Sequence, residues 1–271
     1  MADILAHHAH IFPESVNPGA TLGRLLRLMD ECGIAQVVTF APFAHQVEHF
    51  DQKPNAWLAQ TIATESRCFG FGTIDFARTD QKDQVREIRE LGLKGIKLHP
   101  NIQKFDILSP PALEVYAAAH EHNLMISFHT GVHHYRLKHY NLLNFDEIAH
   151  QFPDLHFCLE HVGGYHFFPE ALAVIFNNIP FPPVPGFQPR VMGGLVSVFN
   201  RKKLPFWYLP PERMMDAIDQ VGADKFIFGI DFPYNQEEDT RMGLAAIRAL
   251  PIPEEQKAML LGGNLRRELN R

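Results

Sequence analysis

The feature that most constrains the fold is a regular alternation, along the whole chain, of short apolar runs with stretches of helical periodicity. Such runs are typical of strands buried on both faces, as in a parallel sheet that helices cover. The runs that we interpret as strands number eight, at residues 4–11, 37–40, 68–74, 95–99, 124–128, 155–159, 194–199 and 226–230. Eight such units favour a closed (β/α)₈ barrel, an α/β fold that residues 1–271 form as a single domain.

The intervening stretches have the periodicity of amphipathic helices. Leu22, Leu25 and Met29 recur at helical spacing, and Gly33 follows as a residue that can end a helix in the left-handed conformation. An open, doubly wound sheet is the alternative architecture, but no GxGxxG turn follows the first strand. Further helices are expected at residues 56–65, 85–91, 111–122, 145–152, 170–177 and 214–221.

Residues 180–190 fit neither pattern, because their density of proline excludes both a helix and a central strand. We expect an irregular loop within the barrel domain. Two interpretations remain open: a stiff surface connection, or a loop that covers the site or contacts a second subunit.

Composition and charge narrow the class of protein. The 25 Lys and Arg against 31 Asp and Glu give a net charge of −6, which provides no basic field for nucleic acid. The apolar runs are too short to span a membrane, and the first residues lack the pattern of a secretory signal. The three cysteines are widely spaced and form no CxxC pair, as is typical of reduced thiols. We therefore expect a cytoplasmic protein whose partner is a small molecule.

The 16 histidines are the most informative residues, because histidine is the commonest metal ligand. In a barrel the active site lies at the carboxyl ends of the strands. His8 and His10 are two residues apart in the first strand, so both point to one face, and His7 is expected to face the helices. The ends of later strands carry His129, His161 and Asp231. Imidazole and carboxylate are the ligands that Zn²⁺ prefers, so we predict a metal centre at this end of the barrel.

Several ordered motifs resemble those of the amidohydrolase superfamily, in its amidohydrolase-related branch of metal-dependent hydrolases and decarboxylases. The motifs are HAHIFP (8–13), GIKLHP (95–100), FHTG (128–131), EHVGG (160–164), FGIDFP (228–233) and GGN (262–264). The resemblance implies a (β/α)₈ barrel with one divalent metal ion, held by His8, His10, His129 and Asp231. It further implies that His161 orients or deprotonates the water at the metal.

The chain departs from this family pattern at Ala6, where many members have an aspartate two residues before the first metal-binding histidine. We expect either a missing hydrogen bond to a metal ligand or a compensating partner for it, and not the loss of the metal. Lys97 lies where some relatives carry a lysine that bridges two metals. Three interpretations stay open for Lys97, which are a bridging ligand, a cation that faces the substrate, and a packed structural lysine.

The loops after the strands supply the candidates for substrate binding. We predict this role for Lys97, His99, His133, Tyr165, Asn200 and Tyr234. A structural role beside the site is the alternative for His99. Trp207 is interpreted as a residue of the fold or surface, and the aromatic run 206–209, if exposed, is a candidate homodimer surface together with the proline-rich loop.

These residues predict a metal-dependent enzyme that hydrolyses a C–N or C–O bond of a small carbonyl compound. Zn²⁺ is the first expectation, with Mn²⁺ or Fe²⁺ as alternatives. A divalent ion makes water a nucleophile at neutral pH, and Asp231 is predicted to carry its proton to the leaving group. Decarboxylation of an aromatic or muconate-type acid at the same centre is the alternative reaction. A binding protein without catalysis is a third possibility, for which Ala6 is the only support.

Overall fold

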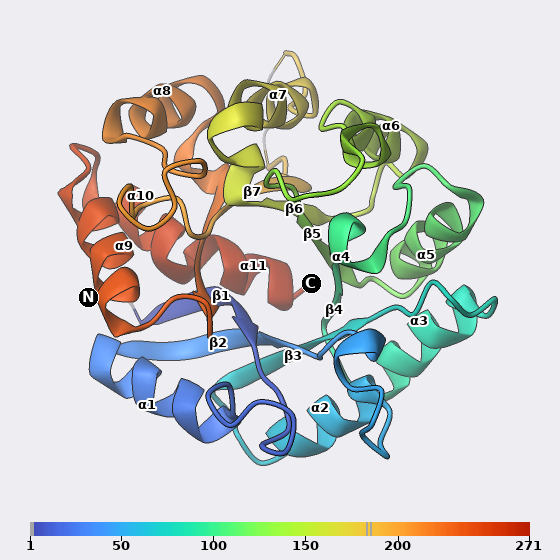
Figure 1. The fold of residues 1–271 in the computed structure, drawn as a ribbon. Helices are drawn as coiled ribbons and strands as arrows, with labels where there is room; N and C mark the ends of the chain where they lie inside the picture. Colours follow the sequence, from blue (N-terminus) through green and yellow to red (C-terminus); the bar gives the residue numbers. More distant parts are fainter. Residues whose placement is uncertain (1–2, 183, 185) are drawn as a thin grey trace.

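The structure is a computed structural model that describes every residue except 1–2, 183 and 185. Across the described residues, parallel strands pair in the order of the chain and the last pairs with the first, which closes the sheet into a barrel (Figure 1). The strands are β1 (Ile4–His10), β2 (Ile34–Phe40), β3 (Cys68–Thr73), β4 (Gly95–Leu98), β5 (Met125–His129), β6 (Phe157–Glu160), β7 (Val191–Leu195) and β8 (Phe226–Phe232). The predicted (β/α)₈ barrel is confirmed.

Helices surround the barrel and bury their apolar faces against its outer surface (Figure 1). The longer ones are α1 (Leu22–Cys32), α2 (Pro54–Ile62), α3 (Gln81–Glu90), α5 (Pro110–Glu121), α6 (Asn144–Gln151), α7 (Gly164–Asn177), α8 (Pro211–Val221) and α9 (Glu237–Ala249). Helix α1 shows how the sequence sets their limits. The Thr21 hydroxyl accepts a hydrogen bond from the Arg24 amide at its start, and Gly33 ends it with φ 69°.

Three further helices are short, namely α4 (Pro100–Gln103), α10 (Glu254–Ala258) and α11 (Asn264–Leu269). Figure 1 shows α11 lying across the centre of the ring. Leu265 and Leu269 of this helix join the apolar cluster inside the barrel, beside residues from the first positions of strands such as Met125. Helix α11 therefore closes the amino-terminal end of the barrel, and the carboxyl ends of the strands are left for the site.

Strand β7 begins three residues earlier than predicted, at Val191 instead of residue 194. The predicted run 194–199 left out Gly193, since glycine lowers the propensity for a strand, and it extends four residues past the end of β7 at Leu195. The structure explains Gly194 by close approach, because a Cβ atom there would lie 2.2 Å from Oε2 of Glu160 in the neighbouring strand. The strand contains a glycine where a buried carboxylate needs the space.

The described residues of the segment 180–190 form no helix or strand; residues 183 and 185 lie outside the described part of the chain. In the aromatic run, Phe206 is about half exposed, whereas Trp207 and Leu209 are buried. Among the described residues, no helix is long and apolar enough to cross a membrane.

Candidate active site

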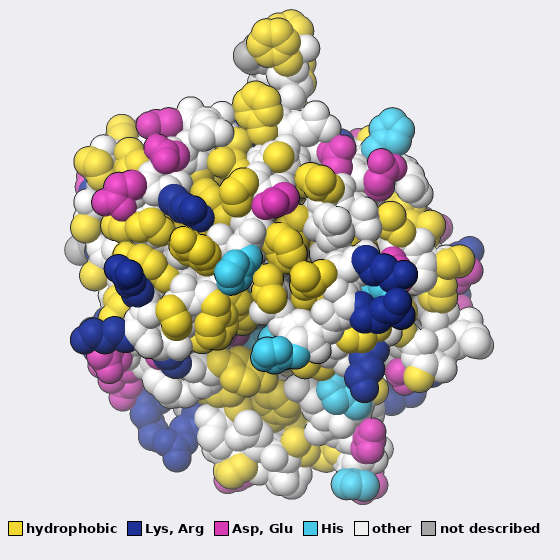
Figure 2. Space-filling model, turned by 45° about the horizontal axis from the view of Figure 1, so that its top comes forward, with side chains coloured by type: hydrophobic (Ala, Val, Ile, Leu, Met, Phe, Trp, Pro, Cys, Tyr) yellow, Lys and Arg dark blue, Asp and Glu magenta, His cyan; other side chains and the backbone are white. Residues whose placement is uncertain are grey.

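A cavity of about 390 Å³ opens at the carboxyl ends of the strands, a size that suits a small molecule. All five residues predicted at the strand ends line it: His8, His10, His129, His161 and Asp231. Aromatic side chains form much of the remaining wall, namely Phe43, Phe206, Trp207 and Tyr234. Figure 2 shows histidine side chains set among hydrophobic ones on the face that it presents.

A bulge in β1 determines which histidines face inward. His8 has φ 71°, and the pairing of β1 with β2 and with β8 shifts register around it. Consequently His7 and His8, although adjacent, both point into the barrel. The His7 ring lies 5.3 Å from that of Phe40 and its Nδ1 lies 2.8 Å from a Glu160 oxygen. The expectation that His7 faces the helices is wrong, because strict alternation does not hold across a bulge.

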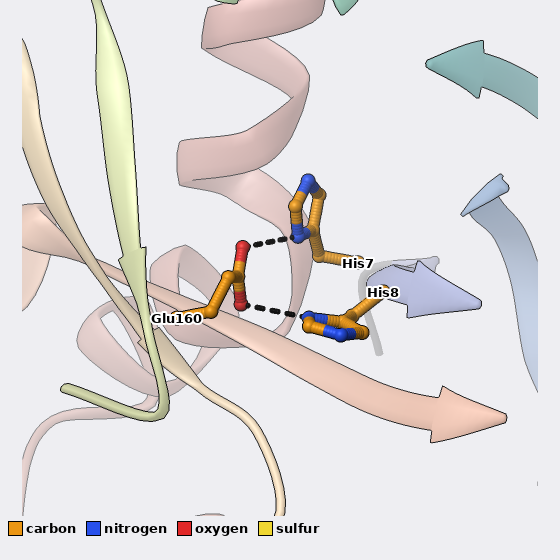
Figure 3. A group of neighbouring side chains, drawn as sticks. All are labelled: His7, His8 and Glu160. Carbon is orange, nitrogen blue, oxygen red and sulfur yellow. Dashed lines mark ion pairs between the residues drawn. The ribbon is translucent and has the colours of Figure 1, made fainter. Parts of the chain in front are cut away.

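Glu160, the last residue of β6, contacts the polar side chains at the inner end of the site (Figure 3). Its Oε1 atom lies 2.8 Å from Nδ1 of His7 and accepts a hydrogen bond of 2.9 Å from the Ser127 hydroxyl. Its Oε2 atom lies 3.1 Å from Nδ1 of His8. Burial raises the pKa of Glu160, but the adjacent imidazoles of His7 and His8 outweigh it and hold this pKa well below its usual value. Glu160 is therefore a buried carboxylate anion.

The position of His8 between two carboxylates indicates a cation site. Its Nδ1 faces Glu160, and its Nε2 lies 3.3 Å from Oδ1 of Asp231. Burial, and then the Lys97 ammonium, lower the pKa of His8 well below its usual value, so the ring is neutral and carries one proton. With that proton on the side of Glu160, a nitrogen lone pair and a carboxylate oxygen face each other. A divalent cation held by His8 and Asp231 would remove this repulsion.

His161 completes a compact group of donors that borders the cavity. One ligand atom each from His8, His161 and Asp231 lie within 4.8 Å of one another. Nδ1 of His161 lies 2.8 Å from the carbonyl oxygen of Val196, which assigns the proton to Nδ1 and leaves Nε2 free to bind a metal. Two imidazoles and a carboxylate fit a divalent metal ion of the zinc type.

Two polar residues that the sequence did not single out position Asp231. The Ser197 hydroxyl donates a hydrogen bond to Oδ2 of Asp231, and the Asn235 amide donates one of 3.0 Å to Ser197. Asp231 and Ser197 both have positive φ, at 57° and 60°. Oδ1 of Asp231 remains directed at His8. No spacing in the sequence links Ser197 to Asp231, because the two lie on different elements.

His10 and His129, both predicted as ligands, line the same cavity but lie outside the compact group. The His10 ring is 5.1 Å from that of His8. Nε2 of His129 lies 3.0 Å from the Gly131 carbonyl oxygen, and its ring stacks on His99 with centroids 3.8 Å apart. Burial lowers the pKa of both His10 and His129 well below the usual value, so both are neutral at pH 7.

The predicted substrate-binding residues separate into two groups. His99, His133 and Tyr234 line the cavity. Tyr165 and Asn200 are not among the residues that line it. Tyr165 is about half exposed with its ring against Arg213, and the Asn200 amide donates a hydrogen bond to Asp239.

Lys97, the sixth of these residues, lies in the interior below the cavity. It is fully buried, and its Nζ is 5.0 Å from the centre of the Phe40 ring and makes no hydrogen bond. Burial lowers the pKa of Lys97 to about 8. Its surroundings are those of a packed lysine.

Trp207 contributes more to the site than the sequence suggested. It is 9% exposed, and its ring stacks on His161 with centroids 4.3 Å apart. A Cβ atom on either Gly131 or Gly164 would lie 2.9 Å from the indole. Both glycines belong to the FHTG and EHVGG motifs, so these motifs make room for the ring that holds His161.

Comparison with known proteins places this geometry in a family. The profile of the amidohydrolase family matches residues 6–270. The chain belongs to that family. Its members are metal-dependent enzymes, which agrees with the donors found around His8.

Solved structures with this fold include enzymes of two kinds. 5-Carboxyvanillate decarboxylase from Sphingomonas paucimobilis is 19% identical with a TM-score of 0.73, and the match covers 100% of this chain and 99% of that one. A dihydroxybenzoic acid decarboxylase from a Polaromonas species, with bound manganese and 2-nitroresorcinol, is 16% identical with a TM-score of 0.72, covering 100% and 98%. A putative 2-pyrone-4,6-dicarboxylic acid hydrolase from Pseudomonas putida is 15% identical with a TM-score of 0.69, again covering 100% and 98%.

Proposed function

We propose that the protein is a metal-dependent hydrolase that cleaves a C–N or C–O bond of a small carbonyl compound. The observation that carries the proposal is the placement of neutral His8 between Glu160 and Asp231, which calls for a cation at the floor of a cavity of substrate size. In this assignment His8, Asp231 and His161 hold the ion. His10 and His129 stay predicted ligands that line the same space.

The residues around the proposed ion have separate roles in the reaction. When bound, a divalent metal polarises a carbonyl group and makes water a nucleophile at neutral pH. Asp231 accepts a proton from the attacking water and delivers it to the leaving group, while Ser197 fixes the carboxylate through its other oxygen. Trp207 holds His161 in place and, with Phe206 and Tyr234, keeps bulk water from the reacting group.

The donor set leaves a choice of metal. Two or more imidazoles and a carboxylate suit Zn²⁺ first, and Mn²⁺ and Fe²⁺ accept the same ligands. The manganese bound by the Polaromonas decarboxylase supports including Mn²⁺ in any reconstitution.

Non-oxidative decarboxylation of an aromatic acid is the second candidate. The aromatic wall of the cavity and the decarboxylases among the structural neighbours favour it. This reaction requires a cation near the substrate carboxylate. Of the candidate cations on the later loops (Arg136, Lys138, Arg201, Lys202 and Lys203), only Lys203 lines the cavity, and it is paired with Asp239 at 2.6 Å. We therefore place hydrolysis first.

The two reactions are separated by one assay on metal-free and reconstituted protein. Esters, lactones and amides of aromatic acids are incubated beside a set of hydroxybenzoates, and both acid release and CO₂ are measured. We expect acid release without CO₂ that is lost on chelation and restored by Zn²⁺ or Mn²⁺. Turnover that chelation leaves unchanged would refute the metal-dependent proposal, and CO₂ from a hydroxybenzoate would establish the second candidate instead.

A further inference from the structure

The cavity has a buried inner end, which carries Asp231, and a partly exposed outer end with aromatic side chains. Asp231 and His8 at the inner end are almost fully buried, whereas Tyr234 and Phe206 at the outer end are about half exposed. Among the described residues that line the cavity, Asp231 and Lys203 are the ones with a carboxylate or ammonium group. Lys203 is thus the cationic side chain that a substrate would meet at a distance from the metal.

The ammonium group of Lys203 is already fully used. It donates to the Tyr234 carbonyl oxygen at 2.7 Å, to Oδ1 of Asn235 at 3.3 Å and to Oδ2 of Asp239 at 2.6 Å. An ammonium group has three N–H donors, and each has an acceptor here. A substrate anion would bind Lys203 only by displacing one of these partners.

Asp239, the charge partner, is itself held in place. Its Oδ1 accepts a hydrogen bond of 2.8 Å from the Asn200 amide, and its Oδ2 accepts one of 3.1 Å from the backbone amide of Gln236. Asn200 also accepts hydrogen bonds from the backbone amides of Lys202 and Lys203. The loop that carries Lys203 and the start of α9 therefore form one rigid wall, in which the two charges cancel.

We propose that the Lys203–Asp239 pair sets the charge selectivity of the cavity, which admits a carbonyl or carboxylate group at the metal end and disfavours an anion at the outer end. A second carboxylate would be removed from water and placed among aromatic rings without a free cation. Because Lys203 is already paired with Asp239, this second carboxylate finds no cation, and the cavity binds such a dianion more weakly than a monoanion. This inference rests on the proposed function only for the position of the reacting group.

The test measures the affinity of the metal-loaded full chain for three ligands by calorimetry. Isophthalate carries two carboxylates, its monomethyl ester has nearly the same bulk with one carboxylate, and benzoate is the smaller monoanion. We expect benzoate and the ester to bind, and isophthalate to bind about tenfold more weakly than the ester, a moderate factor because the outer end is partly open to water. Equal or tighter binding of isophthalate overturns the proposal, as does a failure of all three ligands to bind.

Variants of Lys203 and Asp239 test whether this pair causes the difference in affinity between isophthalate and the ester. Asp239→Asn keeps the oxygen that accepts from Asn200 and removes the charge opposite Lys203, so isophthalate should approach the ester in affinity. Adding Lys203→Met to that variant should restore the difference. If Asp239→Asn does not fold, Lys203→Met alone decides, because it leaves the Asp239 carboxylate without its cation and isophthalate should then bind still more weakly relative to the ester. An unchanged ratio of the two affinities in Asp239→Asn or in Lys203→Met contradicts the proposal.

These affinities are measured without turnover. A chain that hydrolyses none of the esters, lactones or amides would end the proposed function and leave the affinity ratio intact. A ratio near one would end the selectivity proposal and leave hydrolysis intact.

Discussion

The His8 ring has a carboxylate on each side, Glu160 and Asp231, but only the side of Asp231 is open to the cavity. On the inner side, Glu160 lies in a closed space with His7 and Ser127, and each is fully buried. On the outer side, Asp231 and His161 border the cavity. The same pairing of imidazole and carboxylate therefore fixes the His8 ring where it is sealed, and on the open side it leaves donor atoms facing the cavity, where we propose that the ion and the substrate bind.

The largest effect should come from the open side. Asp231→Asn removes the proposed proton acceptor and one proposed metal ligand, so we expect turnover of the best substrate to fall about 10²- to 10⁴-fold. Asp83→Asn is the matched control, since Asp83 is an exposed carboxylate on α3 that pairs with Arg86, away from the cavity. Turnover by Asp231→Asn within a factor of about two of the control would remove Asp231 from the reaction.

A smaller effect is expected from the sealed side. Glu160→Gln removes the anion that orients Nδ1 of His8, and loss of such a partner typically weakens metal binding about 10- to 100-fold. Metal affinity is measured by competition with a chromophoric chelator, on protein whose circular dichroism matches that of the wild type.

Glu268→Gln provides a matched control for this change. Glu268 is also a buried carboxylate against a histidine, with Oε2 at 2.6 Å from Nδ1 of His156, but it belongs to α11 at the opposite end of the barrel. We expect it to lower stability and to leave metal affinity unchanged. Equal losses of metal affinity in both variants would show that Glu160 acts through general stability and not through His8.

The smallest expected effect is a change in stability with pH that depends on Lys97, the buried cation in the barrel interior. Its pKa is lowered from 10.5 to about 8 in the folded protein, so the unfolded chain binds the extra proton between these values. Stability should therefore rise with pH above about 8, by about 1 kcal/mol between pH 7 and pH 9, and this gain should be absent in Lys97→Met. Urea unfolding of the metal-free proteins at both pH values measures the difference between them. A parallel change in both proteins would assign the pH effect to other groups.

The sequence predicted most of what regular geometry controls. Buried strands appear as apolar runs, and the carboxyl ends of parallel strands meet at one edge, so His129, His161 and Asp231 were expected beside His8, and the structure brings them to one cavity. Departures from regular geometry were not predictable in the same way. The bulge at His8 turns His7 inward, and Gly194 leaves space for Glu160, a contact that depends on the packing of two strands.

The contacts that hold the site in place link residues far apart in the chain. Ser197 reaches Asp231 across 34 positions, and Trp207 reaches His161 from a loop that follows β7. Neither side chain has a spacing that marks it. One signal was available for Glu160, because a charged residue directly follows the buried apolar run 157–159. A charge at such a position has to find a buried partner.

The closure of the barrel by α11 has a consequence for how the protein is made. Leu265 and Leu269 fill the interior beside residues from the start of β1 and β5, and Asn264 donates hydrogen bonds to the carbonyl oxygens of Ala223 and Phe226. During synthesis on the ribosome these residues emerge after all the strands. A nascent chain that has formed every strand still exposes the apolar interior at one end, until residue 269 has left the exit tunnel.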